Sequence, residues 1–78
     1  MKIMVVENDP LTAAALAMIL NDAGHHVVGP VASVRDALAR VGPDAPDLVL
    51  VDVELGRGGS GIALARGLKR HYDVPSVF

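Results

Sequence analysis

Two short apolar runs constrain this chain more than any other feature, because each ends in side chains that carry oxygen atoms. Residues 3–6 read IMVV and residues 48–51 read LVLV. Short, β-branched runs that are apolar at every position are typical of strands covered on both faces of a parallel sheet. Ligands of such sheets bind beyond the carboxyl ends of the strands. The residues that follow the two runs are therefore expected to face one site: Glu7, Asn8, Asp9, Asp52 and Glu54.

The rest of the chain alternates between strand and helix signals with short connections. Strands are predicted at residues 2–6, 26–29 and 48–53 and from residue 74 onward, with Pro30 closing the second. Helices are predicted after residue 9, after Ser33 as far as Val41, and at residues 62–71. This alternation predicts an α/β fold, a three-layer α/β/α sandwich around a parallel sheet with right-handed crossovers. No linker divides residues 1–78, so one domain is expected.

The first and third helices carry local signals for their ends and for their buried faces. Asp9 is a suitable N-cap, Pro10 suits the first helical position, and Gly24 suits a left-handed C-terminal cap. Apolar residues at helical spacing predict the face that the first helix buries: Leu11, Ala14, Ala15, Met18 and Ile19. In the third helix the residues expected to face inward are Ile62, Ala65, Leu68 and Tyr72.

Composition excludes several functional classes. The 78 residues are 51% hydrophobic, which indicates a globular chain, and the net charge of −2 gives no general attraction to nucleic acid or to anionic lipid. Cysteine is absent, which rules out disulfides, thiolate catalysis and cysteine-based zinc sites. The apolar run at the N-terminus is too short for a signal peptide, and no stretch is long enough to span a membrane. We expect a cytoplasmic protein.

Several segments, in the same order, resemble the receiver domain of two-component response regulators. They are MVVENDPL at residues 4–11, HVVGP at 26–30, SVRDAL at 33–38, PDLVLVDVEL at 46–55 and GIALA at 61–65. The resemblance implies the flavodoxin-like receiver fold, of which this chain covers roughly the first two-thirds and lacks the last strand and helices. It also implies that the hydroxyl residue and the lysine that contact the phosphoryl group in receivers have no counterpart here.

Carried over position by position, the resemblance makes Asp52 the acceptor of a phosphoryl group from a histidine kinase or phosphotransfer protein. Mg²⁺ would be held by Glu7, by Asp52 and by the backbone carbonyl of Glu54. Asn8 stands where the family usually has a second acidic residue, so it is either a weakened metal ligand or a structural turn amide. An amide oxygen brings no charge, and we therefore expect weakened Mg²⁺ binding.

A second hypothesis is a non-catalytic pseudo-receiver that acts as a protein-interaction module and binds partners without phosphorylation. Separately, we expect a homodimer or a domain swap through parts of the sheet that the helices leave uncovered. The glycine-rich loop at residues 56–61 matches a dinucleotide fingerprint in form. However, that fingerprint belongs after the first strand, this loop follows the third, and Asp52 and Glu54 beside it would repel a pyrophosphate. We therefore interpret it as a flexible loop. The basic residues of the third helix form either a solvated face or a docking surface: Arg66, Lys69 and Arg70.

Overall fold

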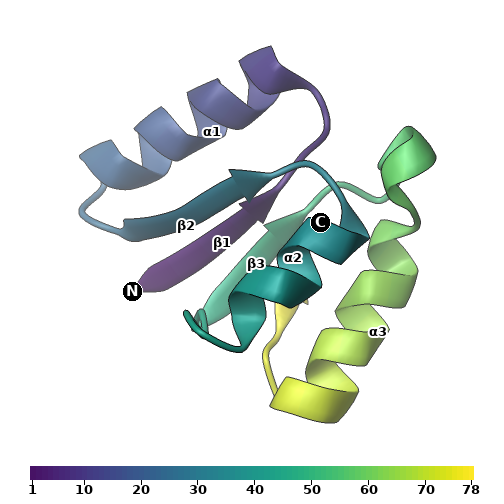
Figure 1. The fold of residues 1–78 in the computed structure, drawn as a ribbon. Coiled ribbons are helices and arrows are strands. Elements are labelled where there is room, and N and C mark those ends of the chain that lie inside the picture. The colour runs from purple at the N-terminus through teal and green to yellow at the C-terminus, as the bar shows by residue number, and fades with distance from the viewer.

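The computed structural model describes residues 1–78 as one parallel sheet with helices on both faces (Figure 1). The strands are β1 (Lys2–Val6), β2 (His26–Val31), β3 (Leu48–Val51) and β4 (Ser76–Val77), and the helices are α1 (Pro10–Asp22), α2 (Val34–Val41) and α3 (Gly61–Tyr72). A short 3₁₀ helix, Gly56–Gly58, precedes α3. The strand order is β2-β1-β3-β4, and every pairing is parallel. The predicted three-layer sandwich is confirmed.

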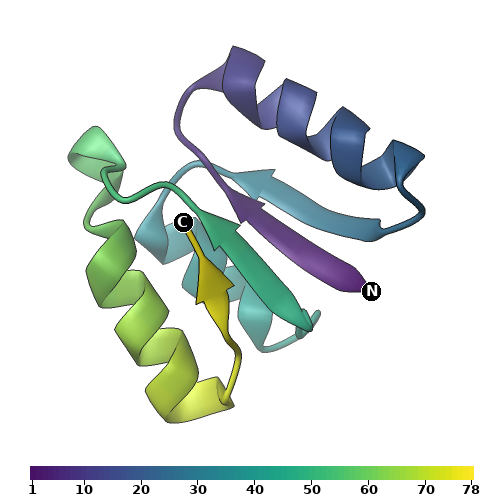
Figure 2. The ribbon, with the colours of Figure 1, turned by 180° about the vertical axis from the view of Figure 1, so that it is seen from behind.

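The two faces of the sheet are covered unequally. Helix α1 lies on one face, and α2 and α3 lie on the other, as the front and back views show (Figures 1 and 2). The larger core is on the α2 and α3 side, where alternate strand residues pack against both helices. Its fully buried members include Met4, Val49, Ala37, Val41 and Leu68. This face holds the domain together, because burial of apolar surface is the main favourable term in folding.

On the opposite face the cover is incomplete. Ile3 and Val5 of β1 are buried beneath α1, whose single fully buried residue is Ala13. Farther along the sheet Leu50 is half-buried and Val77 is exposed. The strands β3 and β4 therefore present apolar side chains on the α1 side without a helix over them.

Helix α1 buries a different side from the one that its sequence pattern predicted. Leu11, Met18 and Ile19 are 83%, 63% and 62% exposed, while the residues that face the sheet are Ala13, Leu16, Ala17 and Leu20. The prediction was wrong because the helix is apolar around its whole circumference, and periodicity cannot then select the buried side. In α3 the prediction for Leu68 is confirmed, but Leu64 is buried in place of Ile62, which is 44% exposed, and Tyr72 is exposed.

Two strand boundaries also differ from prediction, and each difference has a structural reason. Strand β2 continues through Pro30 to Val31, because β2 is an edge strand where a residue without an N–H group is tolerated. Strand β3 ends at Val51 instead of residue 53, since its neighbour β1 has already ended at Val6. None of the helices is both long enough and apolar enough to span a membrane.

Candidate functional site: the acidic edge of the sheet

The pairing of β1 with β3 brings the residues that follow these strands to one edge of the sheet. Val6 lies opposite Val51 in the register, so Glu7 and Asp52 leave the sheet side by side. The backbone N–H of Asp52 donates to the carbonyl of Val6 at 3.0 Å, and that of Glu7 donates to the carbonyl of Val31 at 2.9 Å. Both backbone positions are therefore held by the strands next to them.

Glu7 and Asp52 line the same cavity, which has a volume of about 280 Å³ and apolar walls that include Leu16, Leu50 and Phe78. Both acidic residues are half-buried. Neither carboxylate is paired with a cation, because the two ion pairs of the structure are Lys2–Asp44 and Lys69–Asp73. The structure therefore brings together two carboxylates whose charges no basic side chain compensates.

Backbone groups hold these two carboxylates in place. Oε2 of Glu7 accepts a hydrogen bond from the N–H of Asp9 at 3.0 Å. Oδ1 of Asp52 accepts a longer one from the N–H of Glu54 at 3.4 Å. Each carboxylate retains a second oxygen atom that no protein donor occupies, and this oxygen is free to bind a cation or to act as a nucleophile.

The other candidate residues do not line this cavity. Asn8 is exposed and lies beside the glycine loop, since a Cβ atom at Gly56 would be 3.4 Å from its amide nitrogen. Glu54 is exposed and lines a separate cavity of about 310 Å³. No group of three or more His, Cys, Asp or Glu side chains is placed to hold a metal ion. The acidic edge thus offers two carboxylates, a neighbouring amide and backbone carbonyls.

Asp9 caps α1, as predicted, and does not join the cavity. Its carboxylate accepts hydrogen bonds from the hydroxyl and from the backbone N–H of Thr12, the latter at 3.3 Å. These bonds, the hydroxyl first, hold the pKa of the Asp9 carboxyl below its ordinary value. A carboxylate engaged in this way stabilises the start of the helix, and Asp9 does not line the cavity of Glu7 and Asp52.

Two glycines of the glycine-rich loop lie against neighbouring segments of the protein. Gly58 lies against the backbone of Ala32, and Gly59 lies against the side chain of Val34. Gly61 begins α3 directly beside the backbone of Asp52, where its N–H donates to the carbonyl of Val53 at 2.9 Å. Sequence reasoning missed this positioning role. The signal was a glycine shortly after β3, because a residue without a Cβ atom allows two backbone segments to approach closely.

Comparison with known proteins was made by family, by sequence and by structure. The family model for the response regulator receiver domain matches residues 3–78. The chain is 32% identical over 79 residues to the phyllosphere-induced regulator PhyR of Methylorubrum extorquens, and the match covers 99% of this chain and 29% of PhyR. It superposes on the response regulator PhyR of Brucella abortus with a TM-score of 0.91 and 31% identity, over 99% of this chain and 32% of that one.

A third relative is the anti-anti-sigma factor PhyR of Bartonella quintana, whose structure was solved in complex with the anti-sigma factor NepR. The TM-score is 0.89 and the identity 27%, over 99% of this chain and 32% of that one. The chain thus spans about one-third or less of the length of each of these relatives.

The close contact at Gly61 predicts that a single added methyl group will strongly destabilise the protein. In Gly61→Ala the added Cβ would overlap the carbonyl oxygen of Asp52, so we expect a loss of more than about 3 kcal/mol of unfolding free energy, measured by urea denaturation. Gly67→Ala is the matched control in the same helix, because nothing lies within 4 Å of its Cβ position. It should stabilise the protein by about 0.5–1 kcal/mol. Equal effects of the two substitutions would contradict this assignment.

The cap at Asp9 predicts a dependence of stability on pH. The folded pKa of Asp9 lies below its ordinary value of 3.8, so the contribution is complete above that pH and is lost as the pH falls through the folded pKa. In Asp9→Asn the cap is retained but cannot titrate in this range. Thermal denaturation between neutral and acidic pH should therefore show a smaller loss of stability for Asp9→Asn than for the wild type. Parallel pH curves for the two proteins would exclude this role.

Proposed function

This chain belongs to the response regulator receiver domain family, and from that premise we propose that Asp52 accepts a phosphoryl group from the phosphohistidine of a histidine kinase or phosphotransfer protein. The main support is the position of Asp52, which is half-buried at the carboxyl end of β3 in one cavity with Glu7 and without a basic partner. A carboxylate that is accessible, ordered and unpaired is able to act as an oxygen nucleophile.

In the proposed reaction a carboxylate oxygen of Asp52 attacks the phosphorus atom of phosphohistidine. The new O–P bond forms as the P–N bond breaks, and the imidazole nitrogen leaves with that electron pair and takes up a proton. Asp52 then carries the phosphoryl group as an acyl phosphate. The hydrogen bond from Glu54 N–H to Oδ1 orients the carboxylate, and positioning of this kind is the chief contribution that a protein makes to phosphoryl transfer.

We propose Mg²⁺ as the cofactor, held by Glu7, Asp52 and the backbone carbonyl of Glu54, with Asn8 as a neutral neighbour. The donor chemistry fits, because Mg²⁺ prefers hard oxygen ligands and the two carboxylates have no other cation. When bound, the ion neutralises charge on the phosphoryl oxygens. In this chain Glu7 and Asp52 supply the only side-chain charge within the cavity, so binding should be weak.

A second candidate function is a non-catalytic module that binds a protein partner without being phosphorylated. Two observations favour it. The relative from Bartonella quintana forms a complex with the anti-sigma factor NepR, and in this chain the residue after Glu7 is a neutral amide, Asn8. In this case the acidic edge would be structural, and a surface elsewhere on the domain would carry the function.

Phosphorylation of Asp52 is tested directly by intact mass after incubation with acetyl phosphate and Mg²⁺. We expect one phosphoryl adduct on the wild type and none on Asp52→Asn, which keeps the shape of the side chain but removes the nucleophile. Glu54→Gln is the matched control and should be labelled like the wild type, because only its backbone is proposed to take part. An unlabelled wild type, or an equal adduct on Asp52→Asn, would refute the phosphoacceptor role and favour the binding module.

The neutral side chain of Asn8 predicts a gain of metal affinity on substitution. Asn8→Asp adds a third charge near Glu7 and Asp52, so the affinity for Mg²⁺ should rise by roughly tenfold or more, the equivalent of about 1.4 kcal/mol. Isothermal titration of Mg²⁺ into both proteins measures the change. Ser60→Asp introduces the same charge on the exposed loop and should have a much smaller effect. An unchanged affinity in Asn8→Asp would show that this side chain does not face the metal.

A further inference from the structure

The loop between β3 and α3, residues 53–60, is closed at its base. The N–H of Gly61 donates to the carbonyl of Val53 at 2.9 Å. One step farther along the loop, Glu54 and Ser60 pair in an isolated antiparallel bridge. These interactions tie the two arms of the loop together beside the acidic edge, so we expect the arms to move as one unit.

The tip of this loop lies against the segment that begins α2. A Cβ atom at Gly58 would be 2.7 Å from the carbonyl oxygen of Ala32, and one at Gly59 would be 2.9 Å from Cγ2 of Val34. Distances this short leave no room for a side chain, so the backbone of the loop itself makes the contact. A long side chain could adjust to a small displacement, whereas a direct backbone contact transmits it.

The base of the loop is bonded to the phosphoacceptor. The backbone N–H of Glu54 donates to Oδ1 of Asp52 at 3.4 Å. Formation of an acyl phosphate removes the negative charge from the carboxylate and places charge on the phosphoryl oxygens, so Oδ1 becomes a weaker acceptor. The phosphoryl group also repels the carboxylate of Glu54, which forms no ion pair. Phosphorylation of Asp52 therefore changes the forces that hold the base of the loop.

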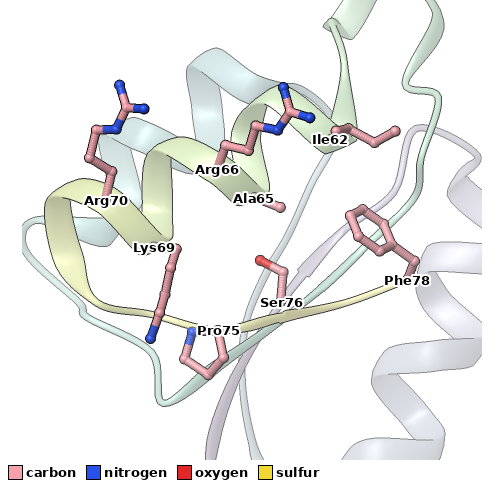
Figure 3. Close-up of a pocket in the computed structure, with 8 residues that line it drawn as sticks. All are labelled: Ile62, Ala65, Arg66, Lys69, Arg70, Pro75, Ser76 and Phe78. Carbon is pink, nitrogen blue, oxygen red and sulfur yellow. The ribbon is translucent and has the colours of Figure 1, made fainter.

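The helix that follows the loop is anchored in the core. Leu64 and Leu68 of α3 are buried, with 2% and 0% of their surface exposed. Ile62 and Ala65 lie on the side of the same helix that faces β4, as Figure 3 shows. These positions fix α3 against the sheet, so the end of the loop that leads into α3 has little freedom to move.

Helix α2 is held less firmly at its start. Its buried residues, Ala37 and Val41, come after the first three residues of the helix. With eight residues, α2 is shorter than the roughly 12 that an isolated helix needs in water, so it depends on packing. Its first turn is held by the cap at Ser33, by packing of Val34 against the core and by the tip of the loop. A displacement of the loop therefore acts on this turn.

We propose that the loop of residues 53–60 links phosphorylation of Asp52 to the stability of α2, so that the modified domain has a loosened α2. This inference rests on the proposed phosphoacceptor role of Asp52. The link consists of the Glu54 N–H at one end and the contacts of Gly58 and Gly59 at the other. A partner that distinguishes the two states must contact a part that differs between them, and we therefore expect a regulated partner to bind at α2.

The test is hydrogen–deuterium exchange of the 78-residue chain with and without acetyl phosphate and Mg²⁺. Intact mass of the same samples reports the phosphoryl adduct. In the phosphorylated protein the amides of residues 37–41 should exchange at least about threefold faster, because loss of packing opens α2 more often. The amides of residues 19–22 in α1 should exchange at an unchanged rate, since α1 lies on the opposite face of the sheet (Figures 1 and 2).

Two variants of α2 separate the link from a general loosening of the helix. Val34→Ala removes the side chain that contacts the loop, and it should reduce the acceleration to about half or less. Leu38→Ala is the matched control, because it shortens an exposed apolar side chain of the same helix, and it should respond like the wild type. Each variant is compared with its own unmodified form, and circular dichroism checks that it is folded.

The outcomes distinguish this inference from the proposed function. An adduct without faster exchange in α2, or an equal acceleration in Val34→Ala and the wild type, would overturn the link and leave the phosphoacceptor role of Asp52 intact. Absence of the adduct from the wild type would refute the phosphoacceptor role and the link together.

Discussion

The parallel register between β1 and β3 is the constraint on which the rest of the structure depends. It places Val6 beside Val51, and this pairing sets the edge at which Glu7 and Asp52 leave the sheet. The same register directs Met4 and Val49 to the face covered by α2 and α3. Because side chains alternate along a strand, a shift of one residue would bury different residues and move Asp52 away from Glu7. The core and the acidic edge are therefore specified together.

At the acidic edge, repulsion between the carboxylates of Glu7 and Asp52 opposes folding, while the same two charges favour the proposed binding of a cation. Two half-buried carboxylates without a cation disfavour each other, and a third would add to this repulsion in the absence of metal. The neutral amide at position 8 adds no third charge next to Glu7 in the chain, so the repulsion is smaller and the proposed binding of a divalent cation would be weaker than with a carboxylate at that position. One side chain thus affects both the stability of the domain and its proposed chemistry.

Sequence alone was sufficient for the three-layer sandwich around a parallel sheet, for the cap at Asp9 and for the convergence of Glu7 with Asp52, because these depend on local patterns and on the geometry of parallel sheets. It was not sufficient for the buried side of α1, since an apolar helix gives no preference until the sheet selects one. It also did not reveal the role of Gly61, whose importance comes from the approach of a distant backbone segment. Both features depend on contacts between segments that are distant in the sequence, and local patterns carry no information about such contacts.

The unequal cover of the sheet links these observations. On the α2 and α3 side the two helices bury β1, β2 and β3 in one core, which includes Val6 and Val51 directly before the acidic edge. On the other side α1 covers only β1 and β2, so its own outer face and the strands β3 and β4 retain apolar surface. The cavity of Glu7 and Asp52 opens beside this partly covered side, with Leu16, Leu50 and Phe78 in its walls. The incomplete cover of the sheet therefore places the two unpaired carboxylates in a cavity with apolar walls, where an interaction with a cation is stronger than it would be in open solvent.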